Sequence, residues 1–66
     1  MFQEGELIRW YLTYDVGMVK ETGTGIILEV IRFDYTNFNI ITYKVLRSEH
    51  SDVMLFEQHE IEKFKE

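Results

Sequence analysis

The segment Ser48-Glu49-His50-Ser51-Asp52 contains the residue types of a hydrolytic triad. In a triad, a nucleophile, a base and an acid converge from separate elements, so that the acid orients the base and the base activates the nucleophile. Adjacent residues in one short turn point apart and cannot converge in this way. We interpret the segment as a polar hairpin turn, and the sequence predicts no catalytic residue and no enzyme activity.

Two further groups carry residue types that bind ions. His50, Asp52, His59 and the glutamates around them offer imidazole and carboxylate groups, but their spacing matches no metal-ligand motif, and a solvated acidic surface explains the same residues. Gly23-Thr24-Gly25 has glycines like those of a phosphate loop, yet it lacks the six-position spacing and the Lys-Ser/Thr pair. It is interpreted as a turn that requires positive φ. We therefore expect no metal and no cofactor.

Aromatic side chains are more numerous than the core of so short a chain needs. The 66 residues include one tryptophan, four tyrosines and five phenylalanines. Those that do not fit inside are expected at the surface, where aromatic area and cation–π attraction bind peptides and cationic groups. The predicted ligand site consists of Tyr11, Tyr14, Asp15, Tyr35 and Phe38. The alternative is that these rings only cover the open ends of the domain.

Composition restricts the class of protein. Hydrophobic residues make up 45% of the chain and charged residues 29%, which is typical of one small globular domain, here residues 1–66. There is no cysteine, which excludes disulfides and favours a cytoplasmic location. No apolar segment is long enough to span a membrane, so no membrane partner is expected. The net charge of −5 disfavours double-stranded nucleic acid.

Four runs rich in β-branched and aromatic residues predict strands over Leu7–Tyr14, Gly25–Phe33, Ile40–Arg47 and Val53–Phe56. Period-two alternation predicts the inward residues of each strand. These are Ile8, Trp10 and Leu12 in the first run, Ile26, Leu28 and Val30 in the second, and Ile41, Tyr43 and Val45 in the third. Residues 15–24 are expected to form a long loop.

The C-terminal residues 57–66 are compatible with two structures. One is a helical turn near Gln58–Ile61 followed by a short closing strand that buries Ile61 or Phe64. The other is a longer terminal helix, which would be marginal on its own at this length. Both leave the fold mostly β, and we expect the first.

The order of these segments resembles small, uncharacterised SH3-like barrel proteins found among phage gene products. The resemblance rests on Gly5-Glu6-Leu7-Ile8-Arg9-Trp10, Gly25-Ile26-Ile27-Leu28-Glu29-Val30, Tyr43-Lys44-Val45-Leu46 and Glu60-Ile61-Glu62. It implies an all-β, five-stranded SH3-like barrel with a short helical turn near the C-terminus, in the host cytoplasm if the gene is a phage gene. It supplies no catalytic residue.

Three functions remain open from the sequence. The first is a non-catalytic protein-interaction module that binds a host or phage protein, with a basic ligand favoured by the acidic residues. The second is a self-assembling homo-oligomer whose interface consists of Ile27, Ile31, Phe33, Ile40 and Leu46. The third is single-stranded nucleic-acid binding, which requires Arg9, Lys20, Arg32, Lys44 and Arg47 to gather on one face.

Overall fold

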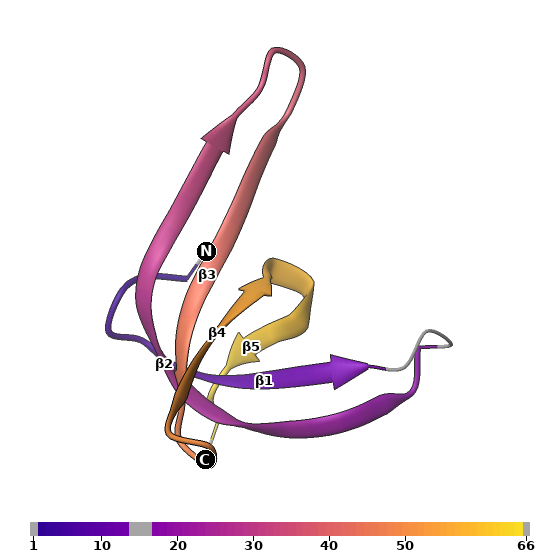
Figure 1. The fold of residues 1–66 in the computed structure, drawn as a ribbon, viewed down its shortest axis with the longest axis vertical. Coiled ribbons are helices and arrows are strands. Elements are labelled where there is room, and N and C mark those ends of the chain that lie inside the picture. Colours follow the sequence, from indigo (N-terminus) through magenta and orange to yellow (C-terminus); the bar gives the residue numbers. More distant parts are fainter. Residues whose placement is uncertain (1, 14–16, 66) are drawn as a thin grey trace.

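Five antiparallel strands and one short 3-10 helix make up the fold in a computed structural model that describes residues 2–13 and 17–65. The sheet order is β4-β3-β2-β1-β5 (Figure 1). The elements are β1 (Leu7–Thr13), β2 (Val19–Asp34), β3 (Asn39–Arg47), β4 (Asp52–Glu57), η1 (Gln58–Glu60) and β5 (Ile61–Lys63). The expected all-β class with five strands is confirmed.

The long strand β2 bends and belongs to both halves of the sheet (Figure 1). Its first part, to Ile26, pairs with β1, and its second part, from Gly25, pairs with β3. The interior of the bent sheet holds seven buried side chains, Ile8, Trp10, Ile27, Tyr43, Val45, Phe56 and Ile61. The edge strands β4 and β5 are not paired with each other, so the described sheet is open.

The inward faces of β1 and β3 are as predicted. Ile8, Trp10, Tyr43 and Val45 are fully buried, and Leu12 and Ile41 pack against them. The prediction for β2 is wrong for two of three residues, because Ile26 and Leu28 are exposed and Ile27 is buried. The pairing with β3 shifts between Ile27 and Glu29. This β-bulge adds one residue to β2, so odd positions face inward before it and even positions, such as Val30, after it.

The glycines of β2 serve close packing and do not form a turn. Gly23 and Gly25 lie opposite Trp10 and Ile8 within the β1–β2 ladder, and neither has positive φ. A Cβ at Gly23 would lie 2.5 Å from Cζ2 of Trp10, and one at Gly25 would lie 2.7 Å from the Leu46 carbonyl oxygen. The interpretation of residues 23–25 as a turn is therefore wrong. The long loop expected over residues 15–24 is also wrong from Val19 onward, where β2 begins, and residues 15 and 16 lie outside the described residues.

Left-handed backbone is found elsewhere, at Gly5 with φ +85°. This residue lies in the turn before β1, and its amide donates a hydrogen bond to the Ile27 carbonyl oxygen at 2.7 Å. Glycine accepts this φ without steric cost. The turn therefore connects the N-terminal segment to the middle of β2.

The C-terminal prediction is confirmed in its first form. η1 is one turn of 3-10 helix, stabilised by a capping box in which the Glu57 and Glu60 side chains bond to each other's backbone amides. β5 then pairs with β1, with Ile61 opposite Trp10, and buries Ile61. The longer terminal helix is not formed. No helix in the described ranges has the length and apolarity needed to cross a bilayer.

Candidate functional site

The residues of the predicted ligand site are not brought together. Tyr35 and Phe38 lie in the loop between β2 and β3, whereas Tyr11 lies on β1, which runs in another direction (Figure 1). The Tyr11 hydroxyl donates a hydrogen bond to the Glu62 carboxylate, which raises the pKa of Tyr11. Tyr14 and Asp15 lie outside the described residues. A single groove that includes Tyr11, Tyr35 and Phe38 is therefore not present.

Tyr35 and Phe38 form the tip of a projecting ribbon. β4 pairs with β3 only from Thr42 onward, so residues 31–34 and 39–41 form a two-stranded extension, which we call the arm (Figure 1). In its loop, the Tyr35 amide donates a hydrogen bond to the Phe38 carbonyl oxygen at 2.8 Å. The two rings stack with centroids 4.9 Å apart, and both are more than half exposed. The arm thus carries an aromatic pair to its far end.

A second apolar surface lies on the convex side of the sheet. Leu46 pairs with Ile26 on one side and with Val53 on the other, so these three side chains form a row across β2, β3 and β4. Leu28, at the bulge, and Leu55, on β4, are also exposed. We call these five residues, Ile26, Leu28, Leu46, Val53 and Leu55, the outer patch.

Four of the five residues predicted for an oligomer interface lie on this convex side. Phe33 pairs with Ile40 on the arm, Ile31 pairs with Thr42, and Leu46 belongs to the outer patch. Phe33, Ile40 and Leu46 are exposed, and Ile31 is partly buried. The prediction of Ile27 as an interface residue is wrong, because Ile27 is only 1% exposed and packs in the core. The bulge after Ile27 reverses the alternation and places this side chain inside.

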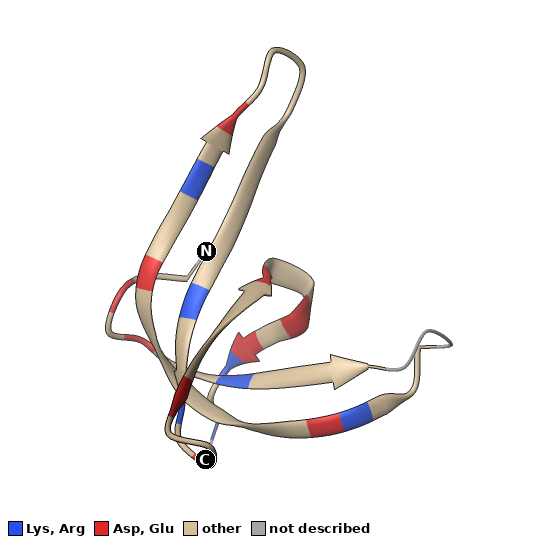
Figure 2. Ribbon diagram, in the orientation of Figure 1, with Lys and Arg blue, Asp and Glu red and all other residues tan. Residues whose placement is uncertain are grey.

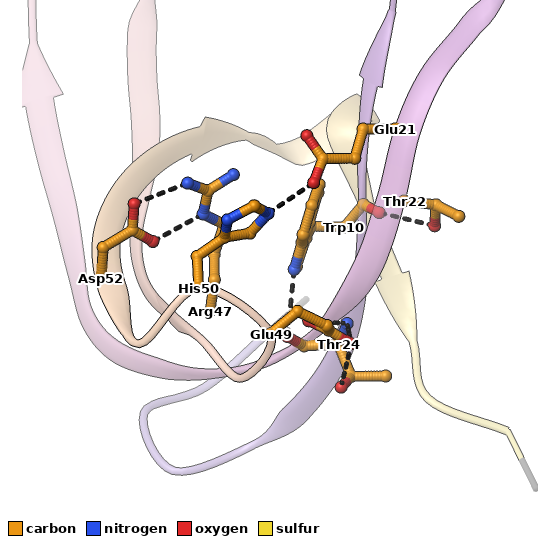
Figure 3. Close-up of polar contacts among 8 residues, drawn as sticks. All are labelled: Trp10, Glu21, Thr22, Thr24, Arg47, Glu49, His50 and Asp52. Carbon is orange, nitrogen blue, oxygen red and sulfur yellow. Dashed lines mark hydrogen bonds and ion pairs between the residues drawn. The ribbon is translucent and has the colours of Figure 1, made fainter.

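A polar cluster connects the β3–β4 turn to β2 (Figure 3). Nε and Nη2 of Arg47 donate to the two Asp52 carboxylate oxygens at 2.7 and 2.6 Å. This hydrogen-bonded ion pair holds the pKa of Asp52 below its ordinary value and raises that of Arg47. The guanidinium carbon lies 5.0 Å from the centre of the Trp10 ring. Arg47 therefore closes one side of the core with its charge paired.

Glu49 and His50 reach from the same turn to β2. Both Glu49 carboxylate oxygens accept the Thr24 amide, at 3.0 and 2.9 Å, and this hydrogen bonding lowers the pKa of Glu49. The Trp10 indole Nε1–H donates to the Thr24 carbonyl oxygen at 3.0 Å. A ring nitrogen of His50 contacts the Glu21 carboxylate. The contacts of Glu49 and His50 hold the turn against β2, beside Trp10 (Figure 3).

The cluster has no arrangement for nucleophilic catalysis among the described residues. His50 contacts Glu21 and lies near the Trp10 ring, and no hydrogen bond joins it to Ser48 or Ser51. The interpretation of residues 48–52 as a hairpin turn is confirmed, but sequence reasoning missed the cluster itself. The sequence signal was indirect: a glycine within a strand, such as Gly23, indicates close approach of another group.

Basic residues do not gather on one side (Figure 2). Arg47 faces the core and Lys44 faces outward, 3.9 Å from Glu29. Arg9 lies over the Phe64 ring, with its guanidinium carbon 5.6 Å from the ring centre. The face required for single-stranded nucleic acid is therefore not assembled from the five predicted residues.

Glu57, His59 and Glu60 bring one possible ligand atom each to within 4.8 Å of one another at η1. Imidazole and carboxylate groups of this kind are ordinary metal ligands, and here two of the three residues are exposed. His59 and the two glutamates beside it were among the residues considered from the sequence, whereas His50 and Asp52 do not belong to this group. The described ranges enclose no pocket.

Comparison with protein-family models, with curated proteins and with solved structures finds no match for this chain.

Proposed function

We propose that this chain is a non-catalytic protein-interaction module that binds a basic, extended segment of a partner protein through its arm. The observation that carries the proposal is the stacked, solvent-exposed pair Tyr35 and Phe38 at the end of a projecting β-ribbon. Aromatic rings supply contact area and cation–π attraction at little entropic cost. Asp34, exposed directly beside Tyr35, favours a cationic ligand.

The tip alone supports only weak binding. Covering the exposed parts of the two rings contributes on the order of 5 kcal/mol, while association costs at least about 4 kcal/mol. Additional contacts along the arm are therefore part of the proposal. β1 pairs with β2 only up to Ile26, so the β2 edge of the arm has no strand beside it among the described residues. An extended segment adds to such an edge through main-chain hydrogen bonds.

The proposed fold family is the SH3-like barrel. It is supported by the strand order β4-β3-β2-β1-β5, by the bend of β2 and by the single 3-10 turn before β5. A phage origin, with function in the host cytoplasm, follows only from the resemblance stated above. The proposed binding mode depends neither on a phage origin nor on a cytoplasmic location.

An NMR titration of the ¹⁵N-labelled protein with two synthetic ten-residue peptides tests the proposal. One alternates valine and arginine, and the other, the charge-reversed control, alternates valine and glutamate. We expect the arginine peptide to shift the amide signals of residues 31–40 and the glutamate peptide to shift none of them. The double variant Tyr35→Ala/Phe38→Ala weakens binding at least about tenfold, whereas Tyr11→Phe leaves it unchanged.

Three results would contradict the proposal. The arginine peptide could shift only signals outside the arm, both peptides could bind equally, or the double variant could bind like the wild type. Circular dichroism of each variant shows whether the sheet is intact.

A further inference from the structure

The outer patch is a sheet face with no covering element among the described residues. Its five aliphatic side chains are between 37% and 56% exposed. On the same side of the sheet, the arm adds Phe33 and Ile40, which pair with each other. A partly exposed side chain of this size presents roughly 90 Å² of apolar surface. The seven residues together therefore present about 600 Å², the upper range for the largest patch on a monomer.

This area matches what a stable dimer needs. A standard interface removes about 800 Å² from each partner, of which about 65% is apolar in homodimers, or about 500 Å². The seven residues supply that amount from one side of the sheet. Within residues 2–13 and 17–65, the core consists of seven buried apolar side chains, so covering this surface adds substantially to a small interior.

Charge identifies the second copy as the occupant. Glu29 and Lys44 lie opposite each other on β2 and β3, with Leu55 next to Lys44 on β4, so a single opposite-charge pair lies within the apolar surface. Their side chains are 3.9 Å apart and about half exposed. A two-fold axis between them places Glu29 of one chain against Lys44 of the other, and the reverse. The surface is thus complementary to itself in charge as well as in apolar character.

We propose that two copies of this chain associate through the convex faces of β2, β3 and β4, with Glu29 and Lys44 paired across the interface. Two such sheets pack about 10 Å apart, as in a β-sandwich. The acidic residues Glu60 and Glu62 lie on η1 and β5, outside the contact, and the exposed Glu57 lies at the end of β4, beside Thr42 and beyond the seven apolar residues. The inference does not depend on the binding function of the arm tip.

Sedimentation equilibrium of the full chain from about 10 μM to about 1 mM tests the proposal. We expect the mass to rise to twice the 8.0 kDa of one chain. Val53→Glu, within the outer patch, raises the dimer dissociation constant at least about tenfold. The matched control is Val19→Glu, because Val19 and Val53 are both strand valines with about half of their surface exposed, and Val19 lies outside the patch. A monomer throughout, or equal dimerisation of both variants, would overturn the proposal.

Charge reversal tests the pairing across the interface. Glu29→Lys and Lys44→Glu each place like charges against one another in a homodimer, so each variant alone is expected to be monomeric. An equimolar mixture restores opposite charges between the chains and is expected to form a heterodimer. No association in the mixture would refute the two-fold arrangement. Tyr35→Ala/Phe38→Ala must leave the mass unchanged, which separates this surface from the arm tip.

Discussion

Substitution of Gly23 by alanine tests the packing at the centre of β2. The added methyl carbon would lie 2.5 Å from Cζ2 of Trp10 and 2.5 Å from Oε1 of Glu49. Glu49 can rotate away, although it then loses its hydrogen bonds to Thr24. Trp10 cannot, because it is fully buried, stacks on Phe56 and donates its indole N–H to the Thr24 carbonyl oxygen. The contact with Trp10 therefore determines how much stability Gly23→Ala removes.

The expected change in the free energy of unfolding follows from two opposing effects. Forcing one methyl group into a packed core costs about 1–3 kcal/mol, and the reduced freedom of the unfolded chain returns about 0.4–1 kcal/mol. We expect Gly23→Ala to lower the free energy of unfolding by about 1–2 kcal/mol. A domain of 66 residues has roughly 3–10 kcal/mol in total. The loss is therefore large enough to measure by urea denaturation.

A double-mutant cycle assigns the loss to the indole. Trp10→Phe removes the ring atom that meets the new methyl group, so Gly23→Ala should cost at least about 1 kcal/mol less in that background. The unfolding m-value should stay constant, which shows that the denatured state is unchanged. A cost below about 0.5 kcal/mol for Gly23→Ala alone, or strict additivity with Trp10→Phe, would refute this account of the contact.

Three further substitutions have defined outcomes. Asp52→Asn should lower the urea midpoint at pH 7, because Arg47 lowers the folded pKa of Asp52 and the ion pair stabilises the fold above the unfolded pKa of about 3.9. The wild type loses this advantage as the pH falls through the folded pKa, so the two midpoints should converge in acid, and a constant difference would contradict the assignment. Tyr43→Phe should raise the free energy of unfolding by about 1 kcal/mol, because the buried Tyr43 hydroxyl has no hydrogen-bond partner among the described residues. A clear loss of stability in thermal denaturation would disprove this. Ile61→Ala should lower the free energy of unfolding by about 2–4 kcal/mol and Phe64→Ala by less than about 1 kcal/mol, since of these two residues only Ile61 is buried. Equal urea midpoints for the two variants would show that β5 does not close the core.

The sequence was sufficient to predict the buried face of the strands in which inward and outward residues alternate regularly. β1 and β3 keep one residue on each face in turn, so Trp10 and Tyr43 could be placed inside by period alone. β5 could be predicted because Ile61 follows a polar segment that suits a helical turn. In β2, one extra residue at the bulge reverses the faces, and nothing in its aliphatic run, where both faces are apolar, marks the position.

The arrangement of the candidate site was harder to predict from the sequence. Tyr35 and Phe38 lie three residues apart in one loop, so their proximity is local and could be anticipated. Their separation from Tyr11 depends on how far β3 extends beyond β4, which is a property of the assembled sheet. The contacts of Glu49 and His50 with β2 are likewise nonlocal, since they join residues separated by 25 or more positions.

The bend of β2 determines which backbone amides are hardest to expose. Gly25 and Ile26 lie between two strands, because each has a partner on β1 and another on β3. Opening either half of the sheet leaves one of these ladders in place, so both must separate before solvent reaches this part of the backbone. Deuterium should therefore enter residues 25 and 26 only through global unfolding, and the arm, with a single ladder, through local opening.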